Sequence, residues 1–104
     1  MRLQYTPEAR SDLKAIEQYI GDELSNQAAA HRIITHILKS CAQLKAQPYL
    51  GMQLEKKIGR ETDLYYLISG KQLIFYRVGA DTISIIRILD GRTNYLQVLF
   101  HDVF

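Results

Sequence analysis

Two arginines lie inside segments whose composition otherwise predicts buried β-strands, and their chemistry raises the first question about this chain. Arg77 falls in the run LIFYRV and Arg87 in the run TISIIRIL. A guanidinium group inside a sheet is costly unless it reaches solvent or pairs with a carboxylate. Two interpretations stay open. The arginines either extend to solvent or pair with an acid, or they line an exposed basic groove on a sheet face that no helix covers. The candidate acids are Asp63, Asp81 and Asp90.

The sequence templates of familiar enzymes are missing from the chain. There is no glycine-rich phosphate loop, no GxSxG elbow around a nucleophilic serine and no HExxH zinc motif. His31 and His36 are five residues apart, which does not place two side chains squarely on one helix face, so we interpret them as solvated. We therefore expect no metal ion and no cofactor.

The composition predicts a small cytoplasmic domain and argues against a membrane protein or a disordered one. The chain has 104 residues, of which 47% are hydrophobic and 23% charged, with a net charge of +2. One domain over residues 1–104 accounts for this length. No apolar run is long enough to cross a bilayer, and the N-terminus lacks the apolar segment of a secretory signal. The mild positive charge permits contact with nucleic acid without requiring it.

The first half of the chain predicts a short strand followed by two helices. Residues 2–5 alternate between polar and apolar types, which is typical of a strand. Thr6 and Pro7 then form a helix start, a capping hydroxyl followed by proline at the first helical position. Ser25 is expected to cap the second helix and Pro48 to end it. The apolar stripes that would face a sheet are Ala9, Leu13, Ile16, Ile20 and Leu24, and then Ala30, Ile33, Ile34, Ile37, Leu38, Cys41 and Leu44. Cys41, the single cysteine, is therefore expected to be a buried thiol.

The second half predicts three strands, which glycine turns join into a meander. The strands are residues 64–68, 73–78 and 82–89. Because alternate side chains of a strand share a face, we expect one face of the last strand to carry Ile83, Ile85, Arg87 and Leu89.

The order of these elements predicts an α+β fold of β-α-α-β-β-β type, with the N-terminal helical hairpin packed on an antiparallel sheet. We interpret residues 49–62 as a loop, because they contain two glycines and mixed charges. Residues 94–104 are expected to form a short apolar tail with about one helical turn.

The second half also resembles the toxins of the RelE/ParE superfamily. The run LYYLISGKQLIFYRV gives a tyrosine-rich strand, a glycine turn and an LIFYRV-like strand, and ISIIRILDGRTNYLQVLF continues with an I-x-R-I/V-L-x-G-R strand ending. With the N-terminal strand and helical hairpin, the resemblance covers nearly the whole chain. It implies the toxin of a type II toxin–antitoxin system, linked to growth inhibition and plasmid stabilisation. A cognate antitoxin would neutralise it and would be its sole link to operator DNA.

The superfamily has two activities, and the residues favour one of them. RelE-like members cut messenger RNA on the ribosome with lysines on the strand that matches residues 64–68 and an arginine near the start of the next. Here the first strand offers Tyr65 and Tyr66 but no lysine, and Leu73 matches the arginine, although Lys71 and Gln72 lie just before it. The resemblance therefore favours the ParE-like branch, whose members poison DNA gyrase.

The resemblance also supplies candidate residues for each function. For binding of gyrase they are Arg77, Arg87 and Arg92. If the chain were instead a ribosome-dependent endoribonuclease, Arg92 and Tyr95 would match the basic and tyrosine pattern after the last strand, and Arg77, Arg87 and His101 would assist. A further alternative is a relative that has lost toxicity and only binds its antitoxin.

The tail carries more large apolar side chains than a short segment can bury against its own domain. Exposed apolar patches usually mark a partner surface. We therefore predict that an antitoxin or a second copy of the chain covers part of the tail or the groove beside it. The expected contacts are Leu96, Leu99, Phe100 and Phe104.

Overall fold

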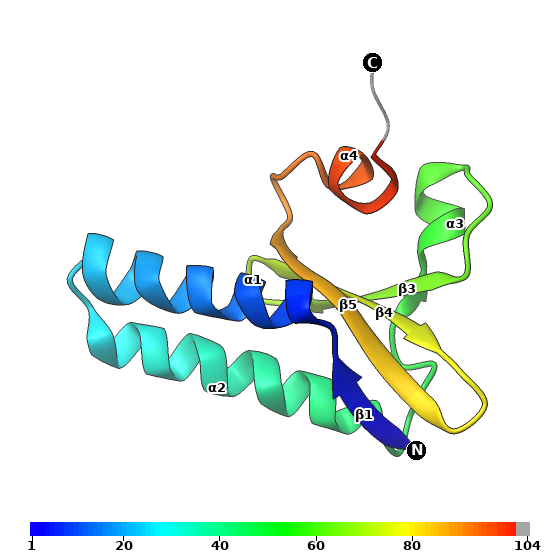
Figure 1. The fold of residues 1–104 in the computed structure, drawn as a ribbon, viewed down its shortest axis with the longest axis horizontal. Coiled ribbons are helices and arrows are strands. Elements are labelled where there is room, and N and C mark those ends of the chain that lie inside the picture. The colour runs from blue at the N-terminus through cyan, green and yellow to red at the C-terminus, as the bar shows by residue number, and fades with distance from the viewer. Residues whose placement is uncertain (102–104) are drawn as a thin grey trace.

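The predicted α+β fold is confirmed by the computed structural model, which describes residues 1–101. A helical hairpin packs on one face of a five-stranded sheet, and two short helices lie over the opposite face (Figure 1). The strands are β1 (Arg2–Tyr5), β2 (Met52–Gln53), β3 (Leu64–Ser69), β4 (Gln72–Val78) and β5 (Thr82–Asp90). The helices are α1 (Pro7–Gln18), the π-helical turn η1 (Tyr19–Glu23), α2 (Gln27–Gln43), α3 (Leu54–Ile58) and α4 (Tyr95–Phe100).

The sheet is antiparallel as expected through the meander of the second half, but the N-terminal strand joins it in parallel, so the sheet as a whole is mixed. Its strand order is β1-β5-β4-β3-β2, and β1 runs parallel to β5 while the other pairs are antiparallel. The parallel pairing matches Leu3 with Ile83 and Tyr5 with Ile85. The hydrophobic periodicity of a segment indicates that it is a strand. It does not indicate whether a neighbouring strand about 80 residues away in sequence runs parallel or antiparallel.

The start of the first helix is as predicted, and the start of the second is shifted by one residue. The side chain of Thr6 accepts a hydrogen bond from Ala9 N at 3.1 Å, and Pro7 opens α1. Asn26, not Ser25, caps α2 by accepting from Ala29 N at 3.0 Å. Both residue types are good caps, but Ser25 takes a left-handed conformation in the turn, with φ of 50°, and cannot fill that role.

Residues 49–62 are not a plain loop, which corrects a second expectation. They contain the two-residue edge strand β2 and the short helix α3, which ends at Gly59 with φ of 68°. Both elements are too short for their hydrophobic period to stand out in the sequence. Leu54, the first residue of α3, is fully buried in the second apolar cluster, so this segment covers part of the sheet.

A β-bulge in β5 overturns the expected alternation of its side chains. Phe75 pairs with Arg87 whereas the next residue, Tyr76, pairs with Ile85, so Ile86 is an extra residue in the ladder. The shift moves Leu89 to the opposite face from the earlier isoleucines. The side chains under the helical hairpin are therefore Ile83, Ile85 and Ile88, and those on the other face are Ile86 and Leu89.

The bulge is also the point at which α1 attaches to the sheet. The Asp12 carboxylate accepts hydrogen bonds from Arg87 Nε and Nη2, both at 2.8 Å, and from Ile88 N at 2.9 Å. Thr6 adds a bond from its hydroxyl to Ile86 O at 2.8 Å. Asp12 is only 11% exposed and Arg87 26%, so this ion pair is largely withdrawn from solvent.

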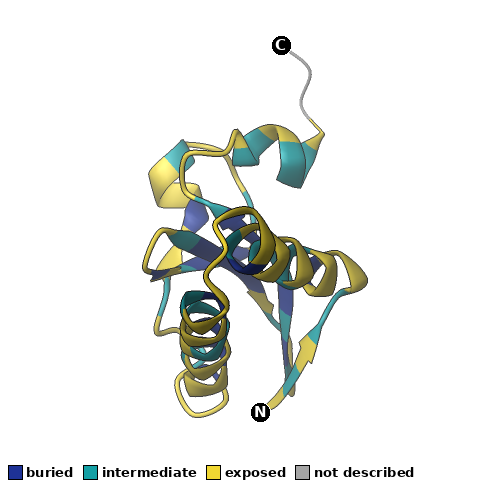
Figure 2. Cartoon of the chain, turned by 90° about the vertical axis from the view of Figure 1, so that its left-hand side faces the viewer, coloured by how far each residue is buried: buried dark blue, intermediate teal, exposed yellow. Residues whose placement is uncertain are grey.

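Each face of the sheet carries its own apolar cluster. Figure 2 shows buried residues, in dark blue, along the strands of the sheet. The first cluster fills the space between the hairpin and the sheet and includes Cys41, which is a buried thiol as predicted. The second lies beneath α3 and α4 and includes Phe75. The tail was expected to bury only part of its apolar side chains against its own domain, and several of its residues, each partly buried, pack on this second cluster. They are Tyr95, Val98, Leu99 and Phe100.

The Asp12–Arg87 pair should make a large contribution to stability. In Asp12→Ala, Arg87 loses its partner and the Ile88 amide loses its acceptor, so we expect the free energy of unfolding to fall by about 2–4 kcal/mol. Urea denaturation followed by circular dichroism measures the change. The control is Asp63→Ala, which breaks the exposed pair with Arg77 and should cost about 1 kcal/mol or less. Equal losses in the two variants would contradict this role for Asp12.

Cys41 should resist thiol reagents for as long as the protein is folded. Burial raises the pKa of the Cys41 thiol to about 11, so the reactive thiolate is scarce at neutral pH and is also inaccessible. Titration with a chromogenic disulfide reagent at pH 8 should give almost no reaction in buffer and one fast equivalent in urea. Rapid labelling of the folded protein would show that the hairpin opens locally.

Candidate functional site

The arginines proposed for target binding do not gather into a basic groove, because each pairs with an acid of its own. Arg77 Nε donates to Asp63 at 2.7 Å, which confirms the pairing interpretation for that residue. Arg87 pairs with Asp12, a partner that was not among the acids considered. Arg92 pairs with Asp90. At one end of β4, Arg77 pairs with Leu64 of β3. At the other end, Gln72 pairs with Asp90 of β5, two residues before Arg92. Arg77 and Arg92 therefore lie near opposite ends of β4.

Arg92 is the most exposed of the three and is held by a local ion pair. Its Nε and Nη2 donate to the two carboxylate oxygens of Asp90 at 3.0 and 2.9 Å, and its backbone amide donates to the same carboxylate at 2.8 Å. These bonds lower the pKa of Asp90 to about 2, so the carboxylate is charged throughout the neutral range. The Arg92 side chain is nevertheless 83% exposed, and a partner could engage it.

The other residues considered for ribonuclease chemistry are not assembled around Arg92. The ring of Tyr95 packs on Phe75, with 5.3 Å between centroids, and so belongs to the second apolar cluster. His101 is exposed at the C-terminal end of α4. Of the five residues considered for catalysis, only Arg92 lines either of the two clefts described next.

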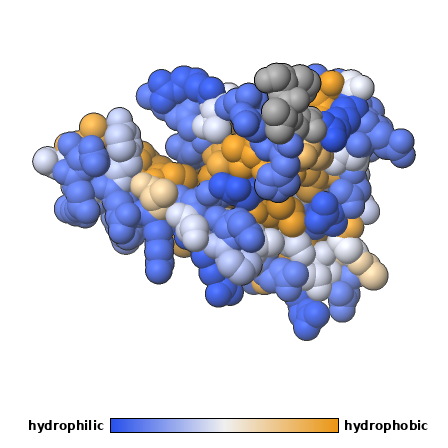
Figure 3. Space-filling model, turned by 45° about the horizontal axis from the view of Figure 1, so that its top comes forward, coloured by the Kyte–Doolittle hydropathy of each residue, from blue (hydrophilic) through white to orange (hydrophobic). Residues whose placement is uncertain are grey.

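The first cleft, here called the hairpin groove, lies between the helical hairpin and the turn that joins β3 to β4. It has a volume of about 1010 Å³. Figure 3 shows apolar surface, in orange, beside the hairpin, which projects on the left of the view. Its apolar lining includes Ile16, Tyr19, Ile20, Leu24 and Ile33, and its polar lining includes Arg32, His36, Ser69, Lys71, Gln72, Asp90 and Arg92.

Two polar contacts mark the floor of the hairpin groove. His36 Nδ1 and the hydroxyl of the buried Ser69 are 2.8 Å apart, which links α2 to the end of β3. Beside them, the Oε1 atom of Gln72 is buried and has no hydrogen-bond partner in the part of the chain that the structure describes. The groove thus combines apolar walls with polar and cationic groups from both α2 and the end of the sheet.

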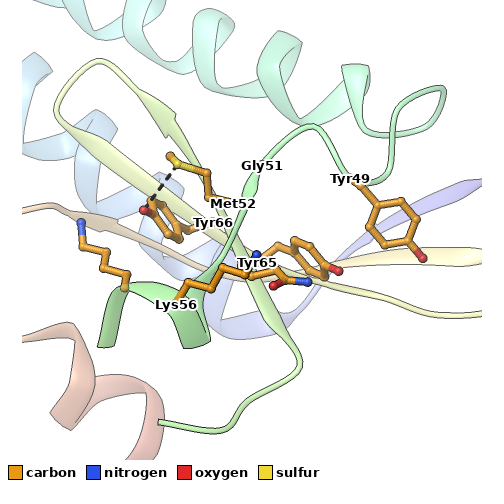
Figure 4. Close-up of a pocket in the computed structure, with 8 residues that line it drawn as sticks. Tyr49, Gly51, Met52, Lys56, Tyr65 and Tyr66 are labelled. Carbon is orange, nitrogen blue, oxygen red and sulfur yellow. Dashed lines mark hydrogen bonds between the residues drawn. The ribbon is translucent and has the colours of Figure 1, made fainter. Parts of the chain in front are cut away.

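The second cleft, here called the tyrosine–lysine cleft, lies at the β2 edge of the sheet and has a volume of about 690 Å³ (Figure 4). Sequence reasoning missed it, because the segment that builds it was interpreted as a loop. The available signal was the grouping of tyrosines and lysines on both sides of this segment. Its lining residues are Tyr49, Gly51, Met52, Gln53, Lys56, Lys57, Tyr65 and Tyr66.

Gly51 fixes the backbone of this cleft against the sheet. Its amide donates to Tyr76 Oη at 2.9 Å. A Cβ atom at this position would lie 2.5 Å from Tyr66 O and 2.7 Å from Tyr76 Oη, which no side chain can tolerate without movement of the strand. Burial raises the pKa of Tyr76 and the bond from Gly51 partly offsets this rise, so the phenol stays neutral. The close approach of residues 49–53 to the sheet therefore requires glycine.

Within residues 1–101 no group of three or more histidine, cysteine or acidic side chains is placed to hold a metal ion. None of the helices in this range is long and apolar enough to cross a membrane. The histidines at positions 31 and 36, considered above as a pair, lie on α2, where His36 bonds to Ser69.

Comparisons with known proteins agree with this architecture. A solved structure of the chromosomal ParDE toxin–antitoxin system from Pseudomonas aeruginosa matches with a TM-score of 0.73 and 22% identity, over 86% of this chain and 95% of that one. The RelBE2 toxin–antitoxin complex from Mycobacterium tuberculosis matches with a TM-score of 0.63 and 18% identity, over 88% and 92%. No curated protein sequence matches the chain. The family model of the ParE toxin of the type II toxin–antitoxin system parDE matches residues 3–95, and the chain therefore belongs to the ParE toxin family.

Proposed function

We propose that this ParE-family chain is a toxin that acts on DNA gyrase in the cytoplasm and that a cognate antitoxin neutralises it. The observation that carries the choice of gyrase is the apolar cover on the sheet face opposite the hairpin. A ribonuclease of the RelE type needs several cations there, around the scissile phosphate. In this chain the face is filled by Leu64, Tyr66, Leu73, Phe75 and Leu89 beneath α3 and α4.

The cations near the start of β4, Lys71 and Arg92, do not make up for the missing cations of a nuclease site. Each well-placed donor in such a site is worth roughly a hundredfold in rate, so the loss of several together removes most of the catalysis. Gln72 and Leu73 stand at the start of β4, and Lys71 is in the turn before it. Arg92 lies near this turn, where Gly91 N donates to Lys71 O at 2.9 Å, but its guanidinium is engaged by Asp90. This arrangement favours binding over catalysis.

Gyrase would contact the exposed arginines. The side chains of Arg77 and Arg92 are 48% and 83% exposed, and both are held by ion pairs that solvent reaches easily. Arg87 differs, because Asp12 engages both of its forked donors inside the α1–sheet contact. We therefore assign target binding to Arg77 and Arg92. To Arg87 we assign a structural role, the attachment of α1 to the sheet.

The antitoxin would cover the hairpin groove and the adjoining part of the tail. Exposed large apolar side chains surround this groove, and such patches mark partner surfaces. They are Tyr19 and Leu24, which both line the groove. From the tail, Leu96 is partly buried and packs on neither apolar cluster, so it is free to join the contact, whereas Leu99 and Phe100 offer only their exposed parts. Phe104, also proposed as a contact, lies outside the described residues. Operator DNA would be reached only through this antitoxin.

The choice of target can be tested with the purified chain. We expect it to inhibit supercoiling of relaxed plasmid by gyrase and to leave messenger RNA intact on translating ribosomes. Arg77→Ala combined with Arg92→Ala should weaken the inhibition roughly tenfold or more, because desolvated arginines are frequent hot spots. Arg10→Ala, which removes an exposed arginine on α1, is the matched control. Specific cuts in messenger RNA that disappear in Arg92→Ala would instead place the chain among the ribonucleases.

The antitoxin surface can be tested in growing cells. The chain expressed alone should arrest bacterial growth, and co-expression of the small protein encoded beside it should restore growth. Leu24→Glu puts a charge into the hairpin groove and should prevent this rescue while toxicity remains. Leu38→Glu alters another exposed leucine outside the groove and should still be rescued. Normal growth at high levels of folded protein would identify a relative that has lost toxicity.

A further inference from the structure

We propose that the tyrosine–lysine cleft binds a nucleotide unit, an aromatic base joined to a phosphate, with the base on Tyr49 and the phosphate at Lys56 and Lys57. The nucleotide is either free or part of a single strand. The cleft has none of the residues assigned above to gyrase or to the antitoxin. The failure of this inference would therefore leave the proposed target unaffected, and the reverse is also true.

Three tyrosine rings form a series that runs from the core to the surface. Tyr76 is fully buried, and its ring stacks on that of Tyr65 with 5.6 Å between centroids and an interplanar angle of 25°. The ring of Tyr65 in turn contacts that of Tyr49 at 5.5 Å and 58°. Tyr49 is 66% exposed, so the outermost ring is held from behind and leaves surface for a further aromatic group. Bases stack on such rings in proteins that bind single strands.

Two lysines line the same cleft as Tyr49 and Tyr65 and are available to bind a phosphate. Among the residues that the structure describes, neither Lys56 nor Lys57 forms an ion pair with a carboxylate. Lys57 Nζ lies 5.0 Å from the centroid of the Tyr66 ring, a cation–π contact that positions the ammonium group without neutralising it. Figure 4 shows Lys56 directed along the cleft on the side of Tyr65. Lysine serves as a point charge for phosphate in many nucleotide sites.

The cleft is already shaped in the free chain, which lowers the entropic cost of binding. Gly51 locks the segment to Tyr76, and the Tyr66 hydroxyl contacts Met52 Sδ at 3.6 Å. The volume of about 690 Å³ lies within the range of roughly 300–1,000 Å³ that is usual for small-ligand sites. Gln53 adds an amide at the cleft that can donate to or accept from the edge of a base. Aromatic surface, free cations and an amide together match a nucleotide better than an apolar ligand.

Fluorescence anisotropy with a labelled oligothymidylate, in DNA and RNA forms, tests the proposal without gyrase or ribosomes. We expect saturable binding that Tyr49→Leu weakens roughly tenfold, because it removes the stacking ring, and that Tyr49→Phe preserves. Lys56→Ala with Lys57→Ala should also weaken binding. The slope of log K against log salt should become shallower by about 0.7 for each phosphate that this variant no longer neutralises. The matched control changes two exposed lysines of the hairpin, Lys14→Ala with Lys39→Ala, and should leave the slope nearly unchanged.

Competition with thymidine monophosphate distinguishes the two sources of the ligand. Displacement of the oligonucleotide by the mononucleotide would show that a free nucleotide suffices, and binding of the oligonucleotide alone would identify a single strand. The proposal is overturned if neither the oligonucleotide nor thymidine monophosphate binds at low salt. It is equally overturned if Tyr49→Leu and the Lys56/Lys57 variant bind as well as the unaltered chain while circular dichroism shows all of them folded.

Discussion

The contact between Asp12 and the bulge of β5 is the interaction on which the rest of the structure depends. One carboxylate accepts three hydrogen bonds, two from the Arg87 guanidinium and one from the Ile88 amide. The bulge makes this possible, because its extra residue breaks the regular pairing with β4 and tightens the local twist. Together with the hydrogen bond from the Thr6 hydroxyl to Ile86 O, the Asp12 contact fixes the first turns of α1 against β5. The position of the hairpin, and with it one wall of the hairpin groove, follows from this contact.

The same bulge decides what the opposite face of the sheet can do. By shifting the alternation, it sends Leu89 to the face away from the hairpin, where Leu89 joins Ile86 and Phe75 in the second apolar cluster. This apolar face then needs a cover, and α3 and α4 provide it. The strand positions beneath α3 and α4 are thus apolar, and the cations nearest to this cluster, Lys57 and Arg60, lie over the rings of Tyr66 and Phe100 rather than among the strand side chains. Arg77 and Arg92 lie near the two ends of β4, where they suit the recognition of a partner.

How far the sequence predicts the molecule depends on the range of the interaction. The Thr6–Pro7 helix start, the strand with Arg77 and the burial of Cys41 follow from neighbours in sequence, and the structure confirms them. The hydrogen bond from Arg87 to Asp12 joins residues 75 apart, and nothing in the local pattern of either indicates it. For the candidate site, the pairing of Arg77 with Asp63 was predictable. Arg77 lies in β4 and Asp63 directly precedes β3, and a short turn joins these two neighbouring strands. Neither cleft was, since each is assembled from elements whose relative placement only the fold determines.

The distribution of charge separates two kinds of basic surface on this molecule. Arg77 and Arg92 are neutralised by adjacent aspartates, so a partner must exchange its own acid for Asp63 or Asp90 before it gains from them. Such exchange is feasible because exposed ion pairs are weak, but it favours a partner whose groups already match the guanidinium geometry. Lys56 and Lys57 have no carboxylate to release within the described chain and can attract any anion that reaches the β2 edge. The arginines therefore favour selective recognition of a protein surface, and the lysines favour less selective binding of phosphate.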